Sequence, residues 1–215
     1  HADGRHYPEA DCPIFKAFRQ GLPCRIDSEV FWRQDGSSFP VEYSSYPVFD
    51  QGQVRGAVVT FVDITERVQA LQMNTLRSDM LECLSSDLPL VPLLEEFARK
   101  LEEALPGTQC AIVLQDQTPA IEAPAHPAHH VLQEPIHSGT NTLLGHLQIT
   151  RPTPEPARAH AMALLQMAAH ITGIAIERKR AEMQLHLSSA VFEQGSEIIM
   201  ITDAKARMVR VNKAF

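Results

Sequence analysis

The first part of this 215-residue chain places short apolar runs between polar turns, a pattern typical of β-structure. An Asp-Gly pair at 35–36 and the sequence DQGQ at 50–53 separate these runs, and glycine supplies the positive φ that tight hairpin turns favour. The pattern therefore predicts a three-stranded antiparallel meander. The runs are rich in β-branched and aromatic residues, and they predict strands over 29–33, 39–49 and 54–64.

Prolines mark particular positions in this part of the chain. Pro13 and Gly21 bound a predicted short helix, because proline suits the first helical turn and glycine suits the C-terminal stop. Pro40 and Pro47 lie inside the second predicted strand, where each removes one hydrogen-bond donor from the ladder. They indicate an edge strand, a bulge or strand ends.

After residue 64 the apolar period becomes helical. Met73, Leu76, Met80 and Cys83 follow a 3-4-3 spacing, which predicts a helix that ends before Pro89. A second helix is predicted over 92–105, with Leu94, Phe97, Leu101 and Leu105 on one face. The remaining short elements are a strand over 110–115, a hairpin over 131–137 and 143–150, and two strands within 197–212 around a turn at 203–206.

A long helix is predicted from about residue 160 to 187. Its apolar residues keep a heptad spacing interrupted by one arginine, Arg178, which suggests a helix that pairs with another. Packing inside the chain's own core is the alternative. The residues predicted to pair are Leu164, Met167, Ile171, Ile174 and Leu185.

Composition excludes some classes of protein. A net charge of −7 argues against nucleic-acid binding, which needs a concentrated basic surface. We expect no membrane segment, because no uninterrupted apolar run reaches the roughly 18 residues of a span. The four cysteines are scattered without a CxxC pair, which favours a reducing cytoplasm. Both ends look cut, so the chain is expected to be a piece of a longer polypeptide.

The stretch FWRQDGSSFPVEYSSYPVFDQGQVRGAVVTFVDITER resembles the C-terminal half of a PAS domain, the sensor module of bacterial signalling proteins. The matching features are an R-x-DG-S-x-F-PVE hairpin, a turn into the last strand and a closing DIT-ER. The resemblance covers residues 1–67. It implies a structural role for the hairpin residues Arg33, Asp35, Gly36, Phe39, Pro40 and Glu42.

Two further resemblances follow along the chain. Residues 88–177 look like a shortened GAF domain whose pocket-lining middle is missing, and AVFEQGSEIIMITDAKARMVRVNKAF resembles the start of another PAS domain. The expected fold is α+β, with an antiparallel PAS-type sheet, a helical linker, a small GAF-like unit and a long heptad-patterned helix into a second partial PAS unit. The expected parts are 1–67 (PAS), 68–87 (signalling linker helix), 88–157 (reduced GAF-like), 158–188 (closing and connector helix, a possible coiled coil) and 189–215 (second PAS).

No glycine or proline separates strand from helix in VVTFVDITERVQAL, residues 58–71. Asp63 or Thr65 can cap the helix through a side-chain oxygen, and Glu66 suits its first turn. In the resemblance, DIT closes the last PAS strand and a signalling helix follows. Asp63, Ile64, Thr65 and Glu66 are therefore the predicted signal junction, since a rigid connection transmits motion that a loop would absorb.

Candidate chemistry is sparse. His126, His129, His130, His137 and His146 lie in or near a proline-rich stretch without carboxylate or cysteine partners at ligand spacing, so we predict no metal site. Cys12 and Cys24 suit small packing residues better than redox sensors. The pairs Glu95-Glu96 and Glu102-Glu103 suit a solvated helix face. No catalytic constellation occurs, so an enzyme is not expected. Neither flavin nor haem, through His1 or His6, is indicated.

The predicted function is a non-catalytic sensory and relay region of a bacterial, cytoplasmic signalling protein. Its resemblance to PAS-GAF-PAS arrays implies a downstream effector in the same chain, either a diguanylate cyclase or cyclic-di-GMP phosphodiesterase, or a histidine kinase. A homodimer through the linker helices is the expected assembly. The alternative is a ligand-free dimerisation or interaction scaffold.

Overall fold

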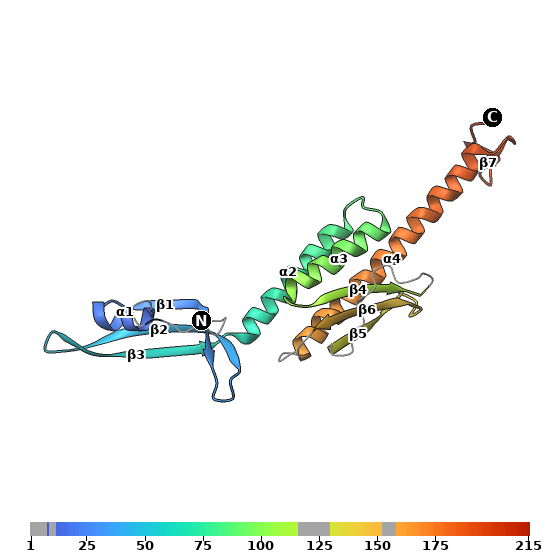
Figure 1. The fold of residues 1–215 in the computed structure, drawn as a ribbon. Coiled ribbons are helices and arrows are strands. Elements are labelled where there is room, and N and C mark those ends of the chain that lie inside the picture. Colours follow the sequence, from blue (N-terminus) through green and yellow to red (C-terminus); the bar gives the residue numbers. More distant parts are fainter. Residues whose placement is uncertain (1–7, 9–11, 116–129, 152–157) are drawn as a thin grey trace. The chain divides into compact units, whose positions relative to one another are not determined.

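The computed structural model describes Pro8 and residues 12–115, 130–151 and 158–215. The chain divides into two compact units, His1–Asn74 and Thr75–Phe215 (Figure 1). Each unit contains an antiparallel sheet and helices, so the predicted α+β class is confirmed. Helix α2 (Thr65–Leu84) begins in the first unit and ends in the second.

The first unit is a meander of three strands with one short helix packed against it. The strand order is β1-β2-β3, all antiparallel, as the turn positions predicted. Gly36 (φ 82°) and Gly52 (φ 79°) occupy the left-handed region in the two turns, where glycine is favoured. The elements are α1 (Pro13–Gln20), β1 (Cys24–Trp32), β2 (Ser38–Asp50) and β3 (Gln53–Asp63).

The two prolines of β2 do not make it an edge strand, because β2 is the middle strand of the sheet. β1 pairs with β2 only up to Ser45, and β3 pairs with it only from Val41 onwards. Pro47 therefore pairs with β3 alone, and Pro40 pairs with β1 and lies one residue beyond the last β2–β3 pair. The edge interpretation is wrong for the whole strand, but its physical reason holds at each proline.

The core of the first unit lies between α1 and one face of the sheet. Val41, Tyr43 and Ser45 alternate along β2, so they share this face, and all are buried. The centre of the Phe31 ring lies 5.5 Å from the centres of the Tyr43 and Phe61 rings, so an aromatic cluster borders the core, with Phe61 exposed. The Tyr43 hydroxyl donates to Glu29 at 2.8 Å, and burial raises the pKa of this phenol.

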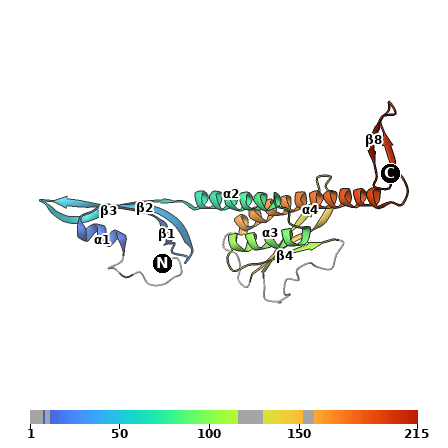
Figure 2. The same cartoon turned by 90° about the horizontal axis from the view of Figure 1, so that it is seen from above.

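The second unit has a sheet of order β4-β6-β5 (Figure 1), and α3 lies beside β4 (Figure 2). α3 packs on β4, and α4 packs on β5 and β6. The predicted face of the second helix is confirmed, since Leu94, Phe97, Leu101 and Leu105 are all buried. The elements are α3 (Leu90–Ala104), β4 (Gln109–Leu114), β5 (His130–His137), β6 (Leu143–Arg151) and α4 (Arg158–Gln194).

Helix α4 is both a core helix and an extension beyond the core. Its buried residues run from Ala161 to Ile176, and the remaining 18 positions to Gln194 contribute none. An 18-residue window of α4 has a mean hydropathy of 1.4, so among the described residues this one helix is long and apolar enough to cross a membrane. Because 56% of that window is buried within the protein, core packing already accounts for its composition.

Two short strands follow α4, β7 (Met200–Thr202) and β8 (Met208–Val211), as the sequence predicted. The Asp203 carboxylate organises their turn by accepting the backbone N–H groups of Lys205 and Arg207 at 2.8 and 2.9 Å. Ala206 has a φ of 58°, so it occupies a left-handed position where glycine would be less strained. Asn212 is buried, and its side chain bonds the backbone of Ile199.

Candidate functional site: the strand-to-helix junction

Only Ile64 separates the last strand of the first sheet from α2. Its backbone N–H donates to the Pro40 carbonyl at 3.1 Å, which continues the pairing of β2 with β3 by one residue. Its carbonyl accepts the N–H of Val68 at 2.9 Å, which is the first helical bond of α2. The Ile64 side chain is 8% exposed. One buried residue therefore belongs to both the sheet and the helix.

Asp63 fixes the direction in which the helix leaves the sheet. Its Oδ1 accepts hydrogen bonds from the Thr65 backbone N–H at 2.9 Å and from the Thr65 hydroxyl at 2.5 Å. Its Oδ2 accepts a hydrogen bond from Arg33 Nη2 at 2.9 Å. The sequence left open which of the two residues caps the helix. In the structure Asp63 is the acceptor and Thr65 is the donor.

A second set of ion pairs joins the first turn of α2 to the sheet. Glu42 of β2 accepts a hydrogen bond from Arg67 Nη1 of α2 at 3.1 Å and another from Arg25 of β1. By itself Arg67 is unfavourable there, because a cation at a helix N-terminus opposes the helix dipole. The contact with Glu42 explains its position. Glu66, the remaining predicted junction residue, is exposed in the same turn.

The predicted hairpin residues divide between this junction and the turn of their own hairpin. Arg33 reaches Asp63 while its guanidinium lies 4.1 Å from the centre of the Phe39 ring. Asp35 accepts hydrogen bonds from the backbone N–H and hydroxyl of Ser37 at 2.9 and 2.6 Å, and Gly36 completes the turn. Sequence reasoning gave Arg33 and Glu42 a structural role and missed their contacts with the junction, because those partners lie 30 and 25 residues away.

These contacts set geometry more than stability. The Arg33 and Asp63 side chains are 48% and 42% exposed, and exposed ion pairs each contribute about 0–1 kcal/mol. Hydrogen bonds from Thr65 and the nearby Arg33 hold the pKa of Asp63 below its usual value. Arg25, and then Arg67, lower the pKa of Glu42 in the same way. Both carboxylates are therefore ionised at neutral pH.

We expect the junction to loosen in acid. The pKa of Asp63 is lowered in the folded state, so its contribution is complete above the ordinary value of 3.8 and is lost as the pH falls through the folded pKa. An NMR titration of the Asp63 carboxyl carbon measures this. Thr65→Ala should raise the midpoint more than Arg33→Ala, because the hydrogen bond from the Thr65 hydroxyl, which alanine removes, is the largest single cause of the lowered pKa. A larger rise with Arg33→Ala would contradict the capping geometry.

The residues predicted to pair helices behave differently along α4. Leu164 and Ile171 are buried in the core of their own unit, so there the structure favours the alternative of internal packing. Ile174 and Leu185 are 44% and 71% exposed, and Met167 is partly buried. Pairing between chains remains a prediction for the exposed part of the helix.

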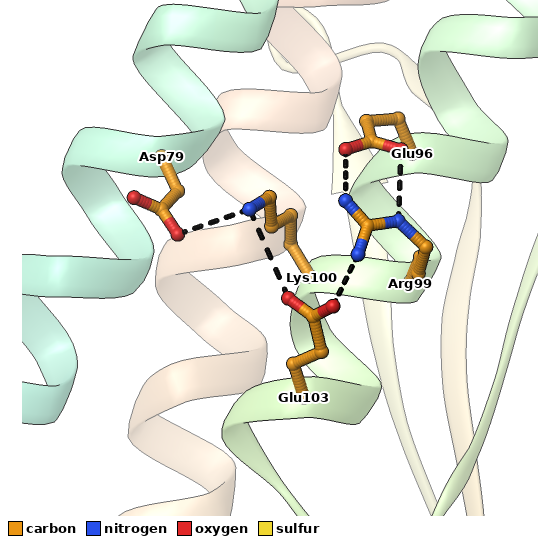
Figure 3. A network of polar contacts seen from close by, with 5 residues as sticks. All are labelled: Asp79, Glu96, Arg99, Lys100 and Glu103. Carbon is orange, nitrogen blue, oxygen red and sulfur yellow. Dashed lines mark hydrogen bonds and ion pairs between the residues drawn. The ribbon is translucent and has the colours of Figure 1, made fainter.

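The sequence suggested that the acidic pairs Glu95-Glu96 and Glu102-Glu103 of α3 are solvated. In the structure, some of these carboxylates also form ion pairs. Arg99 pairs with Glu96 and Glu103, and Lys100 lies 3.4 Å from Asp79 of α2 and 3.8 Å from Glu103 (Figure 3). Hydrogen bonding to Arg99 lowers the pKa of Glu96, so Glu96 is unsuited to act as a general acid near neutral pH.

Glu102 and Glu95 are the other members of these acidic pairs. Glu102 accepts the backbone N–H of Cys110 at 2.7 Å. This hydrogen bond to the backbone is a structural contact, as is the ion pair between Lys100 of α3 and Asp79 of α2. Glu95 is exposed on the same helix.

Within the described part of the chain, no group of three His, Cys, Asp or Glu residues could hold a metal ion. His1, His6, His126 and His129 lie outside the described residues, whereas His130, His137 and His146 lie in the β5–β6 hairpin. Cys12 and Cys24 are free of disulfides and partly buried; Cys12 precedes α1, and Cys24 begins β1, where its thiol donates to the Pro13 carbonyl at 3.6 Å. Burial raises the pKa of the Cys110 thiol to about 12, so it is a poor nucleophile.

Comparison with protein families finds the PAS domain over residues 6–66. The matched segment contains the three-stranded sheet and ends at Glu66, in the first turn of α2. The PAS assignment of this part is confirmed, and a PAS domain indicates a sensory signalling role. A search of curated proteins finds no significant match to the chain.

Proposed function

We propose that this chain is a non-catalytic sensory and relay region of a bacterial signalling protein, in which the junction passes the state of the PAS sheet to α2. The single-residue connection at Ile64 supports this proposal most strongly, because it leaves no loop to absorb a displacement. The Asp63–Arg33 and Glu42–Arg67 contacts add directional bonds on both sides of the helix start. A shift of the strands would then move the helix as one piece.

The proposed mechanism is a change in population between two arrangements of α2. A signal favours one arrangement only to the extent that it binds or stabilises that arrangement better than the other. Resemblance to PAS-GAF-PAS arrays supports a GAF-like identity for the unit after α2 and a second PAS domain at 189–215. It also supports an effector in the same chain, either a cyclic-di-GMP enzyme or a histidine kinase, and a cytoplasmic location.

Asp63→Ala tests the junction because it removes three hydrogen bonds without changing the core. In the full chain we expect hydrogen–deuterium exchange at residues 65–68 to rise about three- to tenfold, in line with roughly 1 kcal/mol for a lost helix cap. A relay further requires a change in exchange beyond Asn74. The matched control is Asp50→Ala, which removes another exposed carboxylate, one that pairs with Arg55 of its own hairpin.

The control is expected to leave exchange in α2 unchanged. If Asp63→Ala alters only the first turn and nothing beyond Asn74, Asp63 is a local cap and the relay proposal fails. If the control changes α2 as strongly as Asp63→Ala, the effect comes from general destabilisation of the sheet.

The second candidate function is a ligand-free dimerisation scaffold. Exposed apolar side chains on the last part of α4 favour it, because an uncovered helix that carries them gains from pairing with a second copy. Mass spectrometry after denaturation separates the two candidates. A small molecule released from the first unit supports a sensor, and a stable dimer that releases none supports the scaffold. The exposed apolar side chains on the last part of α4 are Met183, Leu185, Leu187 and Val191, each more than 60% exposed.

A further inference from the structure

The C-terminal end of α2 receives a hydrogen bond from a side chain 94 residues away. The last carbonyls of a helix lack partners within it, and two serines satisfy some of them locally. Ser85 bonds the Leu81 carbonyl through its N–H and hydroxyl, and Ser86 bonds the Cys83 carbonyl in the same way. The Leu84 carbonyl instead accepts a hydrogen bond from Arg178 Nη1 of α4, at 3.0 Å.

Arg178 is the residue that interrupts the heptad spacing of α4. Seven and fourteen positions earlier, Ile171 and Leu164 point into the core of the unit. At Arg178 the same row of side chains reaches the end of α2 instead. Its Nε donates to Glu182 at 2.8 Å, which holds the guanidinium in place beside the helix end. A cation is also favoured there by the helix dipole.

The contact differs in kind from the packing around it. Leu76, Met80 and Leu84 are buried, and the hydrophobic contribution of such contacts has no fixed direction. A charge-assisted hydrogen bond from a planar guanidinium has a preferred length and direction. The Arg178 bond to the Leu84 carbonyl is therefore a directional contact between α2 and α4.

The far end of α4 is fastened in a similar way. Arg210 of β8 donates to Glu193 at 2.9 Å and to Ser189 at 3.2 Å, and its guanidinium lies 4.7 Å from the centre of the Phe192 ring. A displacement of the end of α4 would thus displace the β7–β8 hairpin through the Arg210 contacts.

We infer that Arg178 is a positioning residue that couples α2 to α4, so that a shift of α2 is passed to α4 and, through Arg210, to the β7–β8 hairpin. The inference rests on the proposed relay function of the junction, because it supplies the route that follows α2. It assigns a regulatory role to a residue that a coiled-coil interpretation treats as a defect.

The first arm of the test asks whether the contact fixes the end of α2. In the full chain, Arg178→Ala should raise hydrogen–deuterium exchange in residues 81–84 about three- to tenfold, and Arg178→Lys should restore part of the protection through a single donor. Glu182→Gln keeps the arginine but removes the charge that holds its guanidinium in place, so it should raise exchange at 81–84 by less than Arg178→Ala. Unchanged exchange at 81–84 in Arg178→Ala overturns the inference.

The second arm measures the coupling itself. Asp63→Ala is introduced with Arg178 intact and in the Arg178→Ala background, and exchange is followed at residues 186–194 of α4. Loss of the Asp63→Ala effect in the Arg178→Ala background supports the coupling. An equal effect in both backgrounds overturns it and leaves the relay standing. If Asp63→Ala changes exchange at residues 75–84 of α2 but not at 186–194 in either background, the relay stands and the inference of coupling fails. If it changes exchange in neither segment, the relay proposal itself fails, while the first arm still decides whether Arg178 fixes the end of α2.

Discussion

Replacing Gly173 with alanine is expected to destabilise the second unit by about 2 kcal/mol. A Cβ at this position would lie 2.2 Å from the carbonyl oxygen of His137, a backbone atom of β5 that cannot rotate away. Overpacking of this kind costs about 1–3 kcal/mol or more. In an unhindered helix the same change would stabilise by about 1 kcal/mol, because alanine is the better helix former. The steric cost outweighs this gain in helix propensity, so the variant is expected to be less stable.

Chemical denaturation of the full chain measures this change, and Gly139→Ala is the matched control. Gly139 lies in the β5–β6 turn, where a Cβ would meet only the flexible Glu177 carboxylate, at 3.5 Å. We expect this control to change the unfolding free energy by less than about 0.5 kcal/mol. A more stable Gly173→Ala variant would show that α4 and β5 do not approach as closely as the structure indicates.

Leu164→Ala is expected to cost about 2–5 kcal/mol, whereas Leu185→Ala should cost less than about 0.5 kcal/mol. The two residues occupy equivalent heptad positions on the same helix. Leu164 is fully buried in the second unit, so its truncation leaves a cavity, and Leu185 is 71% exposed. Comparing the two variants therefore distinguishes core packing from pairing between chains, for residues that lie in the same heptad row of α4.

Chemical denaturation measures the stability of each variant, and sedimentation equilibrium measures its dimerisation. If the exposed part of α4 pairs with a second copy, Leu185→Ala should weaken dimerisation without lowering the stability of the unit. A Leu164→Ala variant of normal stability that no longer dimerises would contradict the internal packing of that residue.

Local pattern was enough to predict most elements of the fold. The 3-4 spacing over 94–105 identified the buried face of α3, and Gly36 and Gly52 marked the hairpin turns. These features depend on neighbours within about four residues, so the sequence carries them directly. The prolines of β2 were harder to interpret, because their meaning depends on where β1 and β3 stop pairing, which no local pattern records.

The candidate site was predictable in part. Asp63, Ile64 and Thr65 were identified because a strand adjoins a helix there without glycine or proline. The contributions of Arg33, Glu42 and Arg67 were not, because ion pairs between exposed side chains leave no periodic trace in a sequence. A cation in the first turn of α2 was the available signal, since it opposes the helix dipole unless a carboxylate lies nearby.

The sequence by itself determined the α+β class, the order of strands and helices, and the position of the junction. Only the tertiary structure decided what the heptad row of α4 contacts. Leu164 and Ile171 enter the core, Arg178 bonds the end of α2, and Leu185 remains exposed. A heptad spacing specifies that one helix face will be covered, and it does not specify the partner. That choice depends on which elements the rest of the chain brings alongside.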